Sequence, residues 1–208
     1  MPQHYTVHPT HPQPRLIRQA VALLRDGAVI VYPTDSCYAL GCGLGAFDAV
    51  SRIRAIRGID ERHPLTLVCH DLAQVGRYAR LDNWQFRVVR QGVPGPYTFL
   101  LPATPEVPRR LKHPRRSAIG VRVPAHPVAA ALVAELGEPV LSTSLILPGE
   151  DAPLNEGDAI VAAVGPRIDA FVDVGPCLGE ASTIVDLAAP PGAIVRLGLG
   201  DPAALGLA

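Results

Sequence analysis

Hydroxyl, carboxylate and arginine side chains recur where apolar runs of this sequence end, and loops at such points usually build sites. The turn at 33–36, Pro-Thr-Asp-Ser, follows the apolar run 28–32 and brings two hydroxyls and a carboxylate together. Arg54 and Arg57 precede the run 63–66, His-Pro-Leu-Thr, and arginines near a helix end can hold an anion. Taken alone, the first segment is an ordinary turn, and surface arginines are the usual explanation of the second.

Three further segments carry polar groups into apolar surroundings. Thr98 follows a rigid Pro-Gly-Pro turn, and Arg122 interrupts the apolar run 119–123. A buried cation needs a partner, because an unpaired buried charge is costly, and that partner is an internal carboxylate or a bound phosphate. A salt bridge is the more frequent solution. The three consecutive hydroxyls at 142–144 also fit helix capping or a turn at a sheet edge.

The elements that must position these segments mix strands and helices. Apolar residues at helical spacing predict a helix over 16–24, which Gly27 ends. Further helices are predicted at 46–56, 71–79, 82–91, 127–136 and 156–164. Strands are predicted at 28–32, 65–69, 97–101, 119–123, 140–144, 170–174, 183–187 and 193–197. Because the two kinds do not alternate strictly, we expect an α/β or mixed α+β fold with a twisted mixed sheet.

Composition favours one domain over 1–208 with a core at about 13–200, because 208 residues with 48% apolar content suit a single core. No apolar run approaches the ~20 residues of a membrane span, and the His- and Pro-rich start does not resemble a secretory signal. We therefore expect a cytoplasmic protein with no membrane partner. The four cysteines lack the paired spacing of zinc sites and are predicted to be buried free thiols.

The net charge of zero hides an asymmetry along the chain. Residues 1–122 hold 17 Lys and Arg against 8 Asp and Glu, whereas the remainder holds 2 against 11. The densest basic cluster consists of Arg109, Arg110, Lys112, Arg115 and Arg116. Such clusters often hold phosphate backbones, which predicts an RNA partner. A solvated loop whose arginines balance acidic residues elsewhere explains the charge equally well.

Taken together, these segments resemble the YrdC/YciO family and its YciO branch in particular. Members carry P-T-D-T/S-x-Y-x-L-G, P-L, P-G-P-x-T, G-x-R-x-P, S-T-S and S-T-x-V-D-L in this order. The corresponding segments here are 33–41, 64–65, 94–98, 120–124, 142–144 and 182–187. The resemblance covers nearly the whole chain.

The resemblance implies a single YrdC-like domain in which the sheet surrounds a basic concave cavity. Threonylcarbamoyl-AMP synthases of this family condense L-threonine, bicarbonate and ATP, and Mg²⁺ accompanies the ATP. The product is the intermediate for threonylcarbamoyladenosine in transfer RNA. Some members bind double-stranded RNA. By this resemblance Thr34 and Arg122 bind the threonine substrate and Arg57 is catalytic. The nucleotide would contact Thr98, Ser142, Ser144 and Arg196. No tightly bound cofactor and no metal held by protein side chains is expected.

Several family positions differ in this chain. The K-x-R motif of the synthases aligns with Arg57 and Ile59, their S-x-N asparagine with Ile146, and their P-L-x-x-H histidine with Val68. Three hypotheses therefore stay open. The chain is a weakened or rewired synthase, a relative with the same cavity and another small substrate, or a non-catalytic RNA-binding module.

Overall fold

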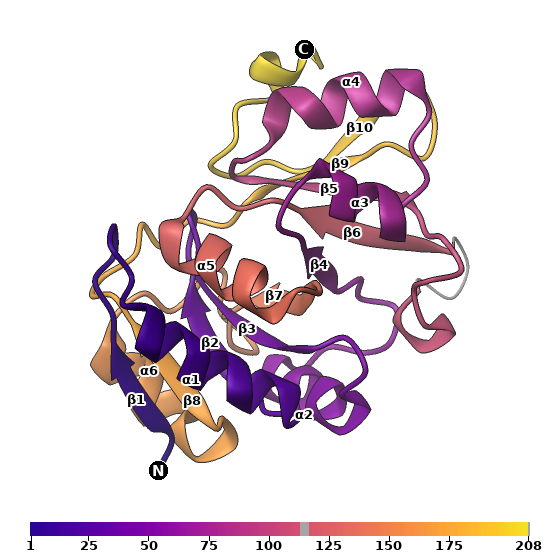
Figure 1. Ribbon diagram of the computed structural model, residues 1–208. Helices are drawn as coiled ribbons and strands as arrows, with labels where there is room; N and C mark the ends of the chain where they lie inside the picture. The colour runs from indigo at the N-terminus through magenta and orange to yellow at the C-terminus, as the bar shows by residue number, and fades with distance from the viewer. Residues whose placement is uncertain (113–116, 208) are drawn as a thin grey trace.

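One mixed sheet of ten strands joins the two halves of the chain in the computed structural model, which describes residues 1–112 and 117–207 (Figure 1). The strands are β1 (Gln3–Thr6), β2 (Ile30–Pro33), β3 (Tyr38–Gly43), β4 (Thr66–Val68), β5 (Tyr97–Pro102), β6 (Ala118–Arg122), β7 (Val140–Ser144), β8 (Ala170–Asp173), β9 (Thr183–Asp186) and β10 (Ala193–Arg196). Their spatial order is β1-β8-β2-β3-β7-β4-β6-β5-β9-β10. Parallel pairs such as β4 with β6 and antiparallel pairs such as β3 with β7 confirm the predicted mixed sheet.

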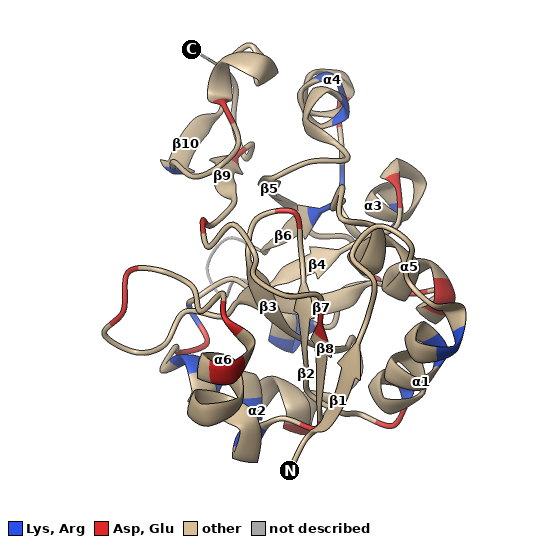
Figure 2. Ribbon diagram, turned by 90° about the vertical axis from the view of Figure 1, so that its left-hand side faces the viewer, with Lys and Arg blue, Asp and Glu red and all other residues tan. Residues whose placement is uncertain are grey.

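Helices cover this sheet on both faces. The α-helices are α1 (Pro14–Arg25), α2 (Phe47–Arg57), α3 (Leu72–Tyr78), α4 (Asn83–Gly92), α5 (Pro127–Leu136) and α6 (Gly157–Val164), and the short 3₁₀ helices are η1 (Arg109–Leu111), η2 (Gly165–Arg167) and η3 (Pro202–Leu205). Figure 2 shows α1 and α5 on one side of β2, β3 and β7, and α2 and α6 on the other. No helix in the described ranges is long and apolar enough to cross a membrane.

Two apolar clusters hold these layers together. The smaller one joins the apolar sides of α1 and α5, including Val21 and Leu132, to Ile30 of β2. The larger one lies among α2, α3, α4 and α6 and contains Ile53 and Phe99. Both faces of the central strands are thus covered, which explains why every residue of β2 and β3 is buried.

Two strands were not predicted from the sequence. β3 is rich in alanine, glycine and cysteine, which have no strong strand preference, and it forms because its neighbours β2 and β7 pair with it on both sides. β1 pairs in parallel with β8. The ordered structure therefore begins before the predicted core boundary at 13, and η3 lies beyond the predicted end at 200.

The cysteines follow the prediction of free thiols. All four are unpaired, and Cys37, Cys42 and Cys69 are buried whereas Cys177 is half-buried. Burial raises the pKa of Cys42 and of Cys69 to about 12, so these two thiols stay protonated at neutral pH.

Gly41 of β3 provides a test of this packing. A Cβ atom there would lie 2.8 Å from both the Tyr32 ring and a Val140 methyl group. We expect Gly41→Ala to lower the free energy of unfolding by about 1–3 kcal/mol through overpacking, measured by urea denaturation. Gly45→Ala is the matched control, because nothing lies within 4 Å of its Cβ position. Equal stability of the two variants would contradict the close approach of β2, β3 and β7.

Candidate functional site

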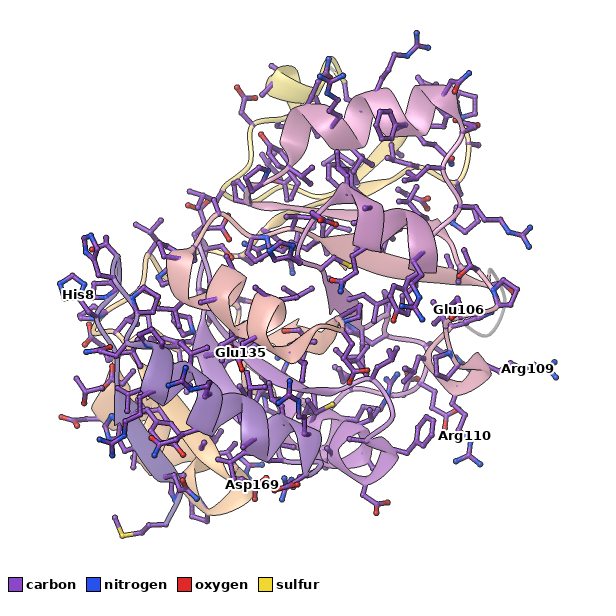
Figure 3. The ribbon with its side chains drawn as sticks, in the orientation of Figure 1. His8, Glu106, Arg109, Arg110, Glu135 and Asp169 are labelled. Carbon is purple, nitrogen blue, oxygen red and sulfur yellow. The ribbon has the colours of Figure 1, made fainter. Side chains whose placement is uncertain are left out.

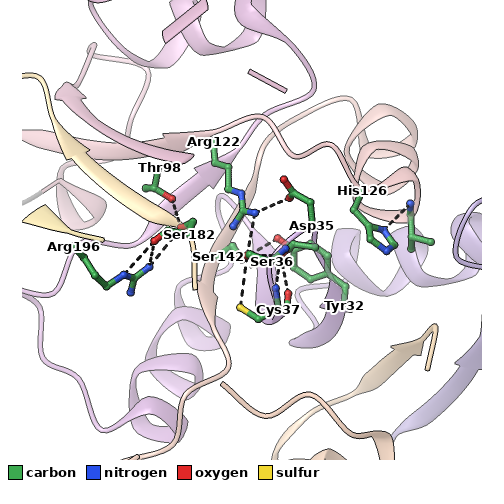
Figure 4. Close-up of polar contacts among 12 residues, drawn as sticks. Tyr32, Asp35, Ser36, Cys37, Thr98, Arg122, His126, Ser142, Ser182 and Arg196 are labelled. Carbon is green, nitrogen blue, oxygen red and sulfur yellow. Dashed lines mark hydrogen bonds and ion pairs between the residues drawn. The ribbon is translucent and has the colours of Figure 1, made fainter. Parts of the chain in front are cut away.

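Strand ends and turns from distant parts of the sequence surround one cavity. Its lining is Thr34, Cys37, Ala39, His63, Pro64, Thr66, Val68, Thr98, Arg122, Ser142, Thr143, Ser144, Ser182, Ile184 and Arg196. All six predicted substrate- and nucleotide-binding residues are among them. The structure therefore brings these side chains together, whereas their individual roles stay predictions. Figure 4 shows the central polar contacts.

The turn after β2 is held by the Thr34 hydroxyl. Thr34 Oγ1 donates to the Cys37 carbonyl at 2.7 Å and accepts from the backbone N–H groups of Ser36 and Cys37. Threonine and serine hydroxyls commonly close turns in this way. Because the hydroxyl serves its own turn, Thr34 shapes the cavity wall and fixes the direction of the neighbouring Asp35.

Arg122 ends β6 and forms a buried ion pair with Asp35. The Arg122 Nη2 donates to Asp35 Oδ1 at 2.6 Å and to Ser36 Oγ at 3.1 Å, and the two charged side chains are only 7% and 14% exposed. The sequence left a carboxylate or a phosphate as partners of this cation, and the structure contains the carboxylate. One atom of each partner, Arg122 Nε and Asp35 Oδ2, is buried without a hydrogen bond. A donor and an acceptor are thus left over beside the cavity.

Ser142 presents an acceptor to the cavity. Its Oγ accepts from the Tyr32 hydroxyl at 2.9 Å and donates to the Leu40 carbonyl at 3.0 Å. The single hydroxyl proton is therefore used within the protein, and one lone pair is left. Tyr32 is fully buried, and this burial raises its pKa to about 12, so it is a neutral donor at all ordinary pH values. In this arrangement Ser142 suits an N–H group of a ligand better than a phosphate oxygen.

Arg196 is positioned by Ser182, the residue directly before β9, which pairs with its own strand β10. Its Nε and Nη2 donate to the Ser182 carbonyl at 3.2 and 2.7 Å. The Ser182 hydroxyl in turn lies 2.9 Å from Thr98 Oγ1. Burial lowers the pKa of Arg196, and the Arg122 charge lowers it further, although a guanidinium remains charged throughout the physiological range.

Arg57 lies in the last turn of α2 and adds another cation near Arg196. It is half-buried, its Nε has no hydrogen bond, and burial followed by the Arg196 charge lowers its pKa. Gly58 ends the helix in the left-handed conformation at φ 63°, which turns the chain directly after Arg57. Ile59, at the position of the family's arginine, packs against the larger apolar cluster. Arg122 and Arg196 line the cavity and make it basic, whereas Arg57, predicted to be catalytic, is not among the lining residues and interacts with Arg196 through its charge. Among the described contacts, Asp35 is the carboxylate that bonds Arg122.

Three members of the site were not selected from the sequence. Asp35 was noted only as the carboxylate of its turn and lies beside the cavity lining through its bond to Arg122. Ser182 lies inside a quoted motif and His63 in the run 63–66, and both line the cavity. Asp35 required knowledge that its turn faces Arg122 from a strand distant in sequence. The described residues contain no group of three His, Cys, Asp or Glu side chains arranged to hold a metal ion.

The predicted RNA-binding cluster lies apart from the cavity lining. Arg109 and Arg110 are exposed on η1, and Figure 3 shows both pointing away from the body of the molecule. Arg110 stacks over the Phe47 ring at 5.5 Å from its centroid, and Lys112 Nζ donates to the Thr104 carbonyl at 2.8 Å. Arg115 and Arg116 lie outside the described residues.

A mixed sheet whose strand ends enclose arginines and hydroxyls defines an α/β protein with a basic, hydroxyl-lined cavity. The family model for Sua5, YciO and YrdC proteins, described as "Telomere recombination", matches residues 22–198. The chain belongs to this Sua5/YciO/YrdC family, which confirms the resemblance found in the sequence.

Similar proteins cover nearly the same length. The "Uncharacterized protein YciO" of Escherichia coli K12 is 44% identical over 97% of this chain and 98% of its own length. A threonylcarbamoyl-AMP synthase of Halorhodospira halophila is 38% identical over 79% of this chain and 85% of its own.

Solved structures agree with the fold. The crystal structure of E. coli YciO superimposes with a TM-score of 0.96 at 43% identity, over 99% of this chain and all of that one. The crystal structure of P. abyssi Sua5 complexed with L-threonine gives a TM-score of 0.85 at 25% identity. That likeness covers 94% of this chain but only 57% of the Sua5 chain.

The Asp35–Arg122 pair leads to a stability prediction. Asp35→Asn keeps the shape of the side chain but leaves the buried guanidinium without a counter-charge, so we expect the free energy of unfolding to fall by about 2–3 kcal/mol. The control is Glu106→Gln, because the Arg77–Glu106 pair spans 3.5 Å with both side chains more than half exposed. Its loss should cost at most ~0.5 kcal/mol. Chemical denaturation of both variants measures the loss in free energy of unfolding. Equal losses would mean that the buried pair stabilises the fold no more than the exposed one.

Proposed function

We propose that the cavity binds ATP together with L-threonine and that the chain is a threonylcarbamoyl-AMP synthase-type enzyme of transfer RNA modification. Relatives named as threonylcarbamoyl-AMP synthases and a Sua5 structure named with L-threonine support this assignment. The observation that carries it is the leftover donor and acceptor of the Arg122–Asp35 pair next to the Arg57 and Arg196 cations.

The ion pair suits the two charges of a free amino acid. Arg122 Nε is an unused donor for a carboxylate, and Asp35 Oδ2 is an unused acceptor for an amine. A ligand that satisfied both atoms would remove two buried unpaired groups, each of which costs about 1–3 kcal/mol in the empty cavity. The same geometry disfavours a ligand with only one of the two charges.

The arginine side of the cavity suits phosphates. In the proposed reaction the threonine amine combines with bicarbonate, with loss of water, to give a carbamate. A carbamate oxygen then forms a bond to the α-phosphorus of ATP, and the bond to the β-phosphate oxygen breaks, so pyrophosphate leaves. Arg57 and Arg196 would stabilise the charge that develops on this leaving group, by position and electrostatics. Mg²⁺ would enter with the ATP phosphates.

The departures from the family motif predict a slow enzyme. Ile59 provides no charge where the family has arginine, and Ile146 and Val68 replace two polar side chains. Each lost contact to a charged group is worth about 1.5–3 kcal/mol. Two such losses correspond to a rate lower by several orders of magnitude.

A pyrophosphate-release assay tests the proposal. With ATP and bicarbonate, we expect slow release that depends on L-threonine, a lower rate for Arg196→Gln by at least about tenfold, and a higher rate for Arg57→Lys with Ile59→Arg. Arg90→Gln on the exposed side of α4 is the matched control and should be unchanged.

The same assay, together with a direct measurement of ATP binding, separates the alternatives. ATP binding without any response to threonine would assign the cavity to another small substrate. Loss of threonine dependence in all variants together with absence of ATP binding would remove the enzymatic proposal altogether.

RNA binding is a second proposal, and the exposure of Arg109 and Arg110 on η1 favours it. We expect Arg109→Gln with Arg110→Gln to weaken binding to duplex RNA and to lower the slope of log affinity against log salt by about 1–2, because each arginine neutralises a phosphate. Arg87→Gln with Arg90→Gln, both exposed on α4, is the charge-matched control. Filter binding at several salt concentrations measures both, and identical slopes would exclude η1 from the RNA contact.

A further inference from the structure

His63 lines the cavity but has no role in the reaction outlined above. It lies in the loop between α2 and β4, directly before Pro64, and it is exposed at the cavity rim. It is the single histidine among the lining residues. Its loop is fixed from two sides, since its N–H donates to the Asp60 carbonyl at 3.3 Å and its carbonyl accepts from Arg54 Nη1 at 3.3 Å.

The charges that face this imidazole are mostly positive. Arg54 and Arg57 act on it from α2 and Arg196 from β10, and Asp60 of its own loop is the opposing carboxylate. Partial burial and the three arginines lower the pKa of His63 below its ordinary 6.5. The imidazole is therefore mostly neutral near pH 7 while the cavity is empty.

We propose that His63 is a phosphate-binding residue whose imidazole takes up a proton when an anionic ligand enters the cavity. This inference rests on the proposed nucleotide binding. It adds that His63 supplies a positive charge in place of the family arginine that Ile59 replaces. Ile59 of the same loop packs into the apolar cluster and supplies no cation, whereas His63 four residues later reaches the cavity. A histidine can supply a positive charge when a ligand is bound. It adds no permanent charge to the empty cavity, which already contains guanidinium groups.

The direction of the coupling follows from electrostatics. A phosphate chain neutralises Arg57 and Arg196, and its own negative charge favours the imidazolium, so ligand binding raises the pKa of His63. The additional affinity is fully present below the pKa of the free protein and is lost as the pH rises through the pKa of the complex. One linked proton changes affinity by at most about tenfold per pH unit.

Calorimetric titration of ATP without threonine tests this. Comparing buffers of different ionisation enthalpy gives the protons taken up on binding, and comparing wild type with His63→Gln cancels the titration of ATP itself. Near pH 6.5 we expect wild type to take up about half a proton more than His63→Gln. The variant should bind about fivefold more weakly at about pH 6 and nearly equally at about pH 8. His70→Gln, on an exposed histidine outside the cavity lining, should behave as wild type.

The outcomes separate this inference from the function on which it rests. ATP binding with the same proton uptake in wild type and His63→Gln, or a loss in the variant that is equal at every pH, would overturn the role of His63 alone. A wild type that binds no ATP at any pH would overturn the nucleotide assignment and this inference together. His63→Lys provides a further check, because a permanent cation should restore affinity while removing the difference in proton uptake.

Discussion

The buried ion pair between Arg122 and Asp35 is the contact on which the site depends. Asp35 follows β2 and Arg122 ends β6, and the sheet order places β3, β7 and β4 between these two strands. The pair therefore links two strands that three other strands separate in the sheet. A charge buried this deeply requires its partner, so the turn after β2 and the end of β6 are fixed relative to each other. Thr34 supports the pair by closing the turn that presents Asp35.

Around this pair the protein concentrates positive charge without neutralising it. Burial and then the Arg196 charge lower the pKa of Arg57, burial and the Arg122 charge lower the pKa of Arg196, and the Nε of Arg57 has no hydrogen-bond partner. Such an arrangement is unfavourable for folding by itself, because like charges repel and desolvation adds a further cost. Strained or unsatisfied groups of this kind are typical of sites whose ligand completes the interaction. The hydroxyls of Thr98 and Ser182 add polar groups that suit the same ligand.

Family membership and catalytic competence are separate questions for this chain. The fold follows E. coli YciO over nearly the whole chain. Of the positions that differ from the synthase motifs, Val68 lines the cavity, whereas Ile59 packs against the larger apolar cluster. The chain has the Asp35–Arg122 pair but no cation at Ile59, so its cavity differs in charge from the one that the synthase motif describes. The basic surface on η1 is a third feature, and it lies apart from both.

The sequence by itself determined the family, most strand and helix positions and six of the polar residues that line the cavity, because short-range patterns and motif order are local properties of the chain. Helix 127–136 was predicted to the residue. Only the tertiary structure decided that β3 is a strand, since its small residues acquire that conformation from pairing on both sides. It also decided the partner of Arg122, the acceptor character of Ser142 and the arginine-rich surroundings of His63. Those features arise from residues far apart in the chain, which only the folded sheet brings into contact.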